Sequence, residues 1–405
     1  MKKFICVAVC AALIICCSPL ALAQEAVVCT EYYYEGYLDP LESIEPVSAD
    51  VHTTLDISAK SVILMEPYTK KILYESNCDE KLAPASITKI MSLLLIMEAI
   101  DEGKLTLETQ VTTSEHAASM GGSQIWLEPG ETMSVHELLK ATVIASANDA
   151  TTALAEAVAG SEEGFVALMN ERAGELGMSN THFENCSGLD AENHLTTAHD
   201  VAIMSSELIK HSLIKEYSTV WMDSLRDGKS ELVNTNKLVR FYEGTTGLKT
   251  GTTSTAGHCL AATAERDGLE LVAVVMGAPT TNDRFNGARK LLDFGFANWS
   301  FATIEPDLTE ISVPKVEKGT GLPLVLTAQP LNLLLKKGAT DKIERTPELP
   351  ETITAPVTKG QVVGYLHLTL DGEQVGVIEL KAASDIPKMN FFVAIKWLIA
   401  QLMRL

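Results

Sequence analysis

The chain has 405 residues, of which 46% are hydrophobic and 21% are charged, a composition typical of a globular protein with room for two domains. Its formal net charge of −21 and the lack of a basic stripe in its sequence argue against nucleic acid as a partner. None of the eight cysteines has CxxC spacing, and no group of histidines has metal-ligand spacing. We therefore expect neither a metal site nor a cofactor.

The first 23 residues have the pattern of a secretory signal peptide: two lysines, an apolar run and the small residues ALA at 21–23. A retained membrane helix is the alternative, although the apolar run is short for a membrane span. Residues 24–56 are acidic and rich in tyrosine and proline, and they follow no period. We interpret them as a linker.

Strand-like runs open the first folded region, residues 57–303. SVILM and KILYES flank EPYTK, which predicts a hairpin. A long helix is expected in SITKIMSLLLIMEAIDEGK, with Ser86 at its start and Gly103 at its end. SVHELLKATVIASANDATTALAEAVAG predicts two helical stretches that meet at residues 146–148. EEGFVALMNERAGELGM predicts another amphipathic helix, which Gly177 closes.

The same region ends in strands and a helix. Thr197 and Asp200 have the spacing of a capping box ahead of another apolar helix. Beyond Gly244, GHCLAATAERDGLELVAVVMGA predicts two strands joined at residues 266–268, a strong hairpin signal. RFNGARKLLDFGFANW predicts a closing helix. Strands, then helices, then strands indicate a sheet covered by a helical cluster.

The sequence pattern changes near residue 304, from long helical stretches to short strand-like runs. Short strand-like runs in 304–384 predict a small all-β domain, a β-sandwich, with one hairpin turning at Asp371–Gly372. Residues 385–405 predict an amphipathic helix whose two faces differ sharply. Its polar arc holds Asn390, Lys396, Gln401 and Arg404, and its apolar arc holds Phe391, Phe392, Ile395, Leu398, Ile399 and Leu402. We expect it to lie in a membrane interface; packing against the protein itself is the alternative.

Ser86 and Lys89 form an S-x-x-K pair in PASITKIMS. Three residues apart at a helix start, their side chains lie on one face. A serine hydroxyl becomes a good nucleophile when a neighbour takes its proton, and a lysine can do so only when neutral. Burial among apolar residues lowers the pKa of a lysine in this way. The spacing alone is weak, because SLIK at 212–215 and SVPK at 312–315 share it.

Two further motifs follow in order. SAN places Ser146 and Asn148 between two predicted helices, and KTG comprises Lys249, Thr250 and Gly251. This order of three motifs, with S-D-N in the middle, is typical of class A β-lactamases and penicillin-binding proteins. Taken singly, SAN could be a polar link between helices and KTG an exposed turn. Together they are far more specific.

With these motifs, the chain resembles the low-molecular-mass penicillin-binding proteins that act as D-alanyl-D-alanine carboxypeptidases. The likeness covers residues 61–300 and includes GGSQIWLEPGE, MNERAGELGMSNTHFENCSGLD, HLTTAHD and TGLKTGTTSTAGHCLAATAERDGLELVAVVMGA. The resemblance implies an α/β fold of the β-lactamase/transpeptidase type, an antiparallel sheet with a helical subdomain. It makes residues 57–303 a penicillin-recognising serine peptidase domain.

The resemblance also implies catalytic roles. Ser86 would attack the carbonyl of the penultimate D-Ala of a peptidoglycan pentapeptide and form an acyl-enzyme. Lys89 would be its base, and Ser146 would relay a proton to the leaving amine. β-Lactams would acylate the same serine, so we expect penicillin sensitivity. The protein would act on the outer face of the cytoplasmic membrane.

Substrate-binding residues follow from the same resemblance. Asn148 would hold the substrate amide, and Lys249 would keep the site electropositive. Thr250 and Arg284 would hold the terminal carboxylate, for which an arginine fork is well shaped. Backbone N–H groups of Ser86 and Thr252 would form the oxyanion hole. An ordinary salt bridge is the alternative for Arg284.

The same motifs also occur in proteins with other functions. A β-lactamase is disfavoured, because the ExxLN string of class A enzymes does not occur between Ser146 and Lys249. A D,D-endopeptidase uses closely related chemistry and stays open. So does a penicillin-binding sensor with little turnover, although the sequence shows no transmembrane relay helix. Trp126 is expected either to line the cleft or to pack in the core.

Overall fold

The computed structural model describes residues 55–392, 394–395 and 399. The predicted signal peptide, nearly all of the predicted linker and 10 of the 21 residues of the predicted C-terminal helix lie outside these residues. Residues 385–390 are described and are not helical, because Ile386 and Lys388 form β-bridges, so the helix was predicted to begin too early. Within the described residues, no helix is both long enough and apolar enough to cross a bilayer.

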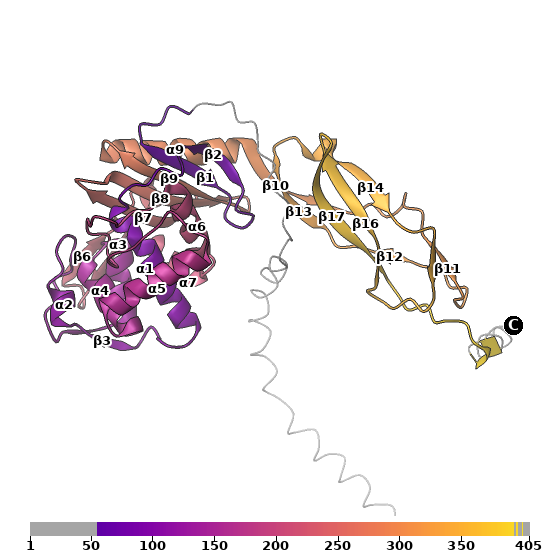
Figure 1. The fold of residues 1–405 in the computed structure, drawn as a ribbon, viewed down its shortest axis with the longest axis horizontal. Helices are drawn as coiled ribbons and strands as arrows, with labels where there is room; N and C mark the ends of the chain where they lie inside the picture. Colours follow the sequence, from indigo (N-terminus) through magenta and orange to yellow (C-terminus); the bar gives the residue numbers. More distant parts are fainter. Residues whose placement is uncertain (1–54, 393, 396–398, 400–405) are drawn as a thin grey trace, which may run out of the picture. The chain divides into compact units, whose positions relative to one another are not determined.

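A five-stranded antiparallel sheet forms the centre of the first domain (Figure 1). Its order is β2 (Ile72–Ser76), β1 (Ser61–Met65), β9 (Leu269–Ala278), β8 (Gly257–Arg266) and β7 (Thr245–Thr253). The central β9 is buried along nearly all its length, as expected for a strand covered on both faces. Asp267 and Gly268 join β8 to β9 with φ of 51° and 77°, which suits the twist of a two-residue hairpin.

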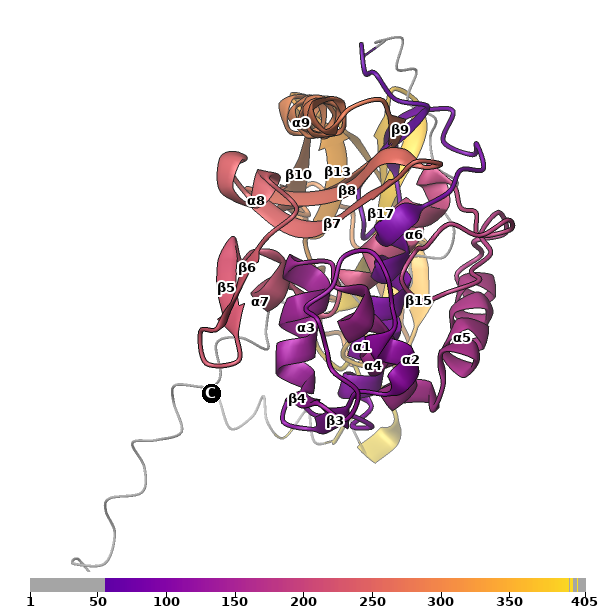
Figure 2. The same cartoon turned by 90° about the vertical axis from the view of Figure 1, so that its left-hand side faces the viewer.

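Helices cover both faces of this sheet. In Figure 2, α9 (Thr281–Asn298) lies on one side of the strands and most of the remaining helices gather on the other. The long helices of this cluster are α1 (Lys89–Asp101), α3 (Val135–Ile144), α4 (Asn148–Ala159), α5 (Glu162–Glu175), α6 (Ala198–Leu208) and α7 (Ser212–Ser218). Short elements complete the domain: α2 (Glu115–Ala118), α8 (Leu238–Phe241), β3 (Gln110–Thr112), β4 (Thr132–Ser134), β5 (Met222–Leu225) and β6 (Ser230–Val233). The predicted sheet with a helical subdomain is confirmed.

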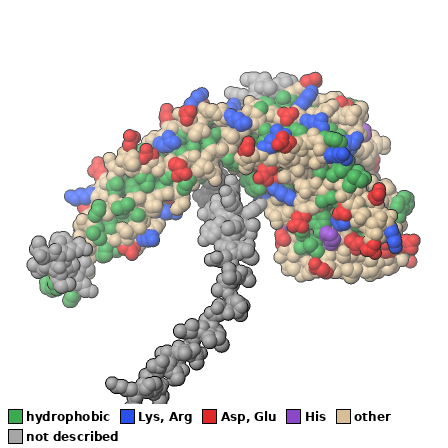
Figure 3. Space-filling model, turned by 180° about the vertical axis from the view of Figure 1, so that it is seen from behind, with side chains coloured by type: hydrophobic (Ala, Val, Ile, Leu, Met, Phe, Trp, Pro, Cys, Tyr) green, Lys and Arg blue, Asp and Glu red, His purple; other side chains and the backbone are tan. Residues whose placement is uncertain are grey.

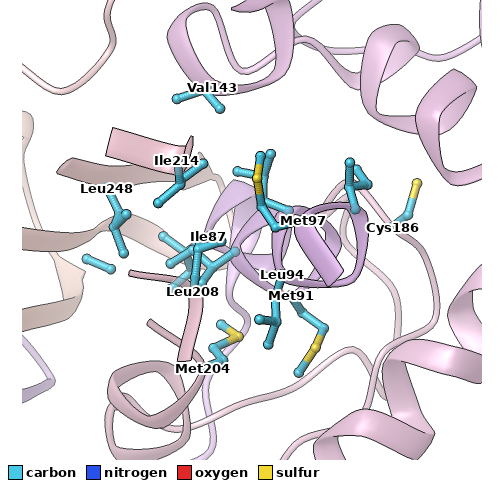
Figure 4. Packing of buried hydrophobic residues seen from close by; sticks show 14 of the residues in the cluster. Ile87, Met91, Leu94, Met97, Val143, Cys186, Met204, Leu208, Ile214 and Leu248 are labelled. Carbon is cyan, nitrogen blue, oxygen red and sulfur yellow. The ribbon is translucent and has the colours of Figure 1, made fainter. Parts of the chain in front are cut away.

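Helix α1 runs through the middle of the core. Its sequence KIMSLLLIMEAID is apolar on nearly all sides, which is typical of a helix surrounded by protein. Figure 4 shows Met91 and Leu94 of α1 on the side that faces Met204 and Leu208 of α6, and Met97 belongs to the same hydrophobic cluster. Helix α1 is buried from its first residue, Lys89. The side chain at its N-terminus therefore lies in the protein interior.

Local signals set the helix ends largely as predicted. The Thr197 hydroxyl accepts the Asp200 N–H at 3.0 Å, so Thr197 caps α6. The reciprocal half of a capping box is replaced, because the Asp200 carboxylate instead accepts from the Asn180 N–H and the Thr181 hydroxyl. A complete capping box stands at α3, between Ser134 and its N3 glutamate.

The second domain contains strands β10–β17 and one 3₁₀ turn within the described residues. The strands are β10 (Trp299–Ile304), β11 (Lys315–Glu317), β12 (Leu326–Thr327), β13 (Leu331–Lys336), β14 (Glu344–Glu348), β15 (Thr352–Thr354), β16 (Val362–Leu370) and β17 (Glu373–Ala382), and the turn is η2 (Thr340–Lys342). Asp371 and Gly372, with φ of 52° and 87°, turn β16 into β17 as predicted. A hydrophobic cluster of its own supports this domain, and the predicted all-β character is confirmed. Residue 303, the predicted end of the first domain, lies inside β10, which pairs with β13.

Charged side chains are spread over the surface. On the face seen in Figure 3, acidic and basic groups alternate among polar residues, and acidic side chains cluster at one end of the helical part. A predominance of acids over bases agrees with the formal charge of −21.

Candidate active site

Ser86 lies in a tight turn just before α1. The sequence predicted it at the start of an α-helix, but residues 85–88 form the 3₁₀ helix η1 (Ala85–Thr88), and α1 begins only at Lys89. Pro84 lacks an N–H, and Ala85 has a left-handed φ of 50°, so the helix cannot extend backwards through them. The turn leaves the Ser86 side chain half-buried, while Ala85 and Thr88 beside it are buried.

The side chain of Lys89 is fully buried and reaches Ser86. Its Nζ lies 3.1 Å from Ser86 Oγ, 2.6 Å from Asn148 Oδ1 and 2.6 Å from the backbone oxygen of Ser187. Burial lowers the pKa of Lys89 from 10.5 to about 7, although the charge of Asp149 opposes this shift. A neutral amine held on two acceptors can direct its electron pair at the Ser86 hydroxyl. The arrangement therefore suits proton removal from Ser86.

Strand β7 brings KTG against this turn. It is an outer strand of the sheet, and η1 packs on it. The approach is so close at Gly251 that a Cβ there would meet the Ser86 nitrogen at 3.0 Å and the Pro84 oxygen at 2.9 Å. Glycine is therefore needed at this position to let the strand lie beside the reactive serine.

Lys249 on β7 is a second buried lysine. Its pKa lies well below the usual value, first because of burial and then because of the positive charges of Lys89 and Arg284. Its Nζ is 3.3 Å from the Thr250 oxygen. Because Lys249 and Lys89 disfavour each other's charge, holding both protonated at once is unfavourable.

The SAN motif occupies the junction of α3 and α4, as predicted. Ser146 is 4% exposed and has a left-handed φ of 62°, an unusual conformation for a residue other than glycine. The Asn148 amide bridges two segments: its Oδ1 accepts from Lys89 Nζ, and its Nδ2 donates to the Gly121 oxygen at 2.6 Å. Asn148 therefore positions Lys89, and one of its two Nδ2 protons is already used inside the protein.

Arg284, on α9, meets the end of β7. Its Nη1 donates to the Gly251 oxygen and to Thr252 Oγ1, both at 2.9 Å, and to the Cys259 oxygen at 3.3 Å. The side chain is 7% exposed, so the alternative of an ordinary surface salt bridge does not describe it. The Thr250 hydroxyl donates to Thr235 Oγ1 at 2.8 Å.

Two residues that help to form the site, Ser187 and Gly188, were not predicted from the sequence. The Ser187 oxygen is one of the acceptors that hold Lys89, and Gly188 next to it has φ 89°. A Cβ on Gly188 would lie 1.9 Å from the Ala85 oxygen, so this loop touches the turn that carries Ser86. The string NCSGLD holds a glycine where a close approach is needed, which is the one signal that could have indicated it.

The competing S-x-x-K triplets have other surroundings. Lys215 of SLIK lies 3.1 Å from the buried carboxylate of Glu270, with which it forms an ion pair. Lys315 of SVPK is exposed on β11. Neither lysine has the buried, serine-facing geometry of Lys89.

No metal centre is found among the described residues, where no group of three or more histidine, cysteine or acidic side chains could hold an ion. The described cysteines Cys78, Cys186 and Cys259 are buried free thiols. His194, also buried, bonds Thr88 Oγ1 at 2.8 Å and accepts the Glu184 N–H. Burial lowers its pKa to about 4, so it is neutral and supports the turn.

Comparisons with known proteins agree with this geometry. Residues 47–280 match the family D-alanyl-D-alanine carboxypeptidase (Peptidase S11), and residues 312–388 match the penicillin-binding protein 5, C-terminal domain. The chain is 45% identical over 343 residues to D-alanyl-D-alanine carboxypeptidase DacF from Bacillus subtilis (strain 168), covering 84% of this chain and 88% of that protein.

Solved structures of penicillin-binding proteins are similar to this chain as well. Penicillin-binding protein 5 from Haemophilus influenzae superposes with a TM-score of 0.70 and 31% identity, covering 83% of this chain and 99% of that one. Penicillin-binding protein D2 from Listeria monocytogenes, in its ampicillin-bound form, has a TM-score of 0.55 and 32% identity over 60% of this chain and 100% of that one. The chain belongs to the D-alanyl-D-alanine carboxypeptidase family of serine-type hydrolases.

Proposed function

We propose that Ser86 is the nucleophile of a D-alanyl-D-alanine carboxypeptidase that trims the pentapeptide stems of peptidoglycan. The contact that carries the proposal is the one between Ser86 Oγ and the fully buried Nζ of Lys89 at 3.1 Å. Ser86 gives its proton to Lys89 and attacks the carbonyl carbon of the penultimate D-Ala, so that a C–O bond forms and the peptide C–N bond breaks.

The proton then leaves with the product. Ser146 passes a proton from the lysine side of the cleft to the departing amine of the last D-Ala. Water hydrolyses the acyl-enzyme, which releases the shortened stem as a carboxylate and restores the Ser86 hydroxyl. Backbone N–H groups of Ser86 and Thr252 stabilise the oxyanion in both steps.

The terminal carboxylate of the substrate binds at the end of β7, near Thr250, Thr252 and Arg284. Arg284 orients Thr252 through its bond at 2.9 Å. A carboxylate in this position raises the pKa of Lys249, because an opposite charge favours the ammonium form. The positive charge then resides on Lys249, and Lys89 stays neutral and able to act. Substrate binding thus prepares the base.

Acylation of Ser86 by benzylpenicillin is expected to become faster as pH rises through about 7. Burial lowers the pKa of Lys89 to about 7, and only its unprotonated form accepts the serine proton. Below that pH the amine carries a proton and cannot act; above it the rate reaches a plateau. Stopped-flow measurements from about pH 5 to about pH 9 check this. A rate that does not change across the range would contradict the role of Lys89.

The remaining segments have proposed roles. Residues 1–23 direct export, 24–56 link them to the peptidase domain of 57–303, and 304–384 form a β-sandwich. Residues 385–405 hold the protein on the outer surface of the cytoplasmic membrane. Phe391 and Phe392 support this, because they are 73% and 77% exposed. Binding of the protein to liposomes, with and without residues 385–405, tests this part.

Release of D-Ala tests the proposal directly. The mature protein, incubated with a muramyl pentapeptide that ends in D-Ala-D-Ala, is expected to release free D-Ala, detectable by mass spectrometry. Ser86→Ala is expected to abolish both this release and covalent labelling by penicillin. Labelling of Ser86 without D-Ala release would instead identify a penicillin-binding sensor. Cleavage of cross-linked dimers without release of terminal D-Ala would identify a D,D-endopeptidase.

A further inference from the structure

Trp126 is one of the most exposed large hydrophobic residues that the structure describes, with 76% of its surface accessible. The sequence was compatible with two positions for Trp126, lining the cleft or packing in the core. This exposure excludes the core. Its backbone has a left-handed φ of 61°, a rare conformation for a bulky aromatic residue. Such strain persists only where the surrounding structure enforces it, and it concentrates at functional sites.

Hydrogen bonds hold the backbone on both sides of Trp126 in this conformation. The buried carboxylate of Asp149 accepts the N–H groups of Ile125 at 3.1 Å and Leu127 at 3.0 Å. Arg226 Nη1 donates to the Ile125 oxygen at 3.0 Å, and its Nη2 lies 3.4 Å from the Trp126 oxygen. The chain is therefore held at both neighbours, and the indole is presented to solvent from a rigid base.

The same segment is attached to the reactive pair. Asn148, which holds Lys89, also donates its N–H to the Ser123 oxygen at 2.7 Å and its Nδ2 to the Gly121 oxygen at 2.6 Å. Asp149, the residue that fixes Trp126, follows Asn148 directly on α4. Adjacent residues of one helix thus hold Lys89 and Trp126. In the proposed binding mode the leaving D-Ala points to the end of β7, so the acyl part of the stem is free to extend toward residues 121–127.

Charge around Trp126 favours a cation. The segment GGSQIWLEPGE, residues 121–131, contains two glutamates and no lysine or arginine. Glu128 is exposed two residues beyond the indole. The neighbouring Arg226 is neutralised by Glu131, whose carboxylate lies 2.8 Å from its Nε. An indole face carries negative charge density and attracts ammonium groups better than other aromatic rings do.

We propose that Trp126 and Glu128 form a subsite that recognises a positively charged, aliphatic side chain on the residue preceding D-Ala-D-Ala in the stem. The indole packs against the methylene groups and the ammonium, and the carboxylate of Glu128 complements its charge. Trp126 is then a specificity-determining residue of the carboxypeptidase. This inference rests on the proposed function of the site.

Matched short substrates test the subsite. N-acetyl-Xaa-D-Ala-D-Ala is prepared with lysine, Nε-acetyl-lysine or norleucine as Xaa, and kcat and KM for D-Ala release are measured for each. The wild-type protein is expected to prefer lysine over norleucine by about two- to fivefold in kcat/KM. Trp126→Ala is expected to abolish the preference through a higher KM for the lysine substrate. Trp126→Phe should retain part of it, and Glu128→Gln should reduce it.

A control and three outcomes make the test decisive. Tyr365→Ala removes another exposed aromatic side chain, on β16 of the second domain, and should leave the lysine preference unchanged. Equal kcat/KM for lysine and norleucine in the wild-type protein would overturn the subsite. An equal loss on all three substrates in Trp126→Ala, with the preference intact, would also overturn it and assign Trp126 a structural role. Absence of D-Ala release from every substrate by the wild-type protein would instead overturn the proposed function.

Discussion

Lys89→Met is expected to slow the acylation of Ser86 by benzylpenicillin by about 10³-fold, within the range that a general base contributes. Methionine is similar in length and apolar, so it fits a fully buried position without placing a charge there. It cannot accept the serine proton, and the contact at 3.1 Å between Nζ and Ser86 Oγ is lost. Stopped-flow or gel-based labelling with a fluorescent penicillin measures the rate.

The control for this substitution is Lys315→Met, in the S-x-x-K triplet of the second domain. Lys315 is exposed, so its replacement should leave acylation unchanged. Circular dichroism and urea unfolding establish that both variants are folded. An acylation rate for Lys89→Met within tenfold of wild type would show that another group removes the serine proton.

Gly188→Ala is expected to reduce kcat/KM for D-Ala release by about 10²-fold, the size of effect that a displacement of about 1 Å causes in an active site. The added Cβ would lie 1.9 Å from the Ala85 oxygen and 2.9 Å from the Ser86 nitrogen, so the backbone that carries the nucleophile must move. The Ser187 oxygen, which holds Lys89 at 2.6 Å, moves with it. The substitution also lowers the free energy of unfolding by about 1–2 kcal/mol, because alanine disfavours a left-handed backbone.

Gly177→Ala separates the two effects. Gly177 has a similar φ of 74°, but no atom lies within 4 Å of the position of its Cβ. We expect a comparable loss of stability in urea unfolding and full carboxypeptidase activity. If Gly188→Ala were as active as Gly177→Ala, the close contact between the two loops would have no part in positioning Ser86.

The sequence predicted the side chains of the site better than their supports. Ser86, Lys89 and Asn148 stand in motifs with fixed spacing, and the structure brings them into one hydrogen-bonded group. The Ser187 oxygen could not be predicted, because every residue has a carbonyl group and only the fold decides which one faces a lysine. The left-handed φ of Trp126 is likewise imposed by Asp149, through contacts that no local pattern records.

For the fold, too, features set by local sequence were predicted better than features set by tertiary contacts. Alternation, apolar runs and turn residues predicted four of the five strands of the sheet and most of the long helices, because these signals are local. Strand β7 and helix α7 were not predicted. Details that depend on partners elsewhere were wrong or missed. Asp200 lies at capping-box spacing, but its carboxylate bonds Asn180 and Thr181, which tertiary packing brings close. Likewise, the helix expected from Ser86 starts as a 3₁₀ turn.

The position of β7 at the rim of the sheet has a consequence for solubility. An outer strand offers unpaired N–H and C=O groups, and a second chain can add to it, which leads to aggregation. Here η1 packs on β7, and the Asn236 side chain donates to the Gly247 oxygen at 3.0 Å. The turn that carries Ser86 therefore also covers part of this outer strand. A substitution that displaces this turn is therefore expected to expose more of β7 and to promote aggregation, in addition to moving Ser86.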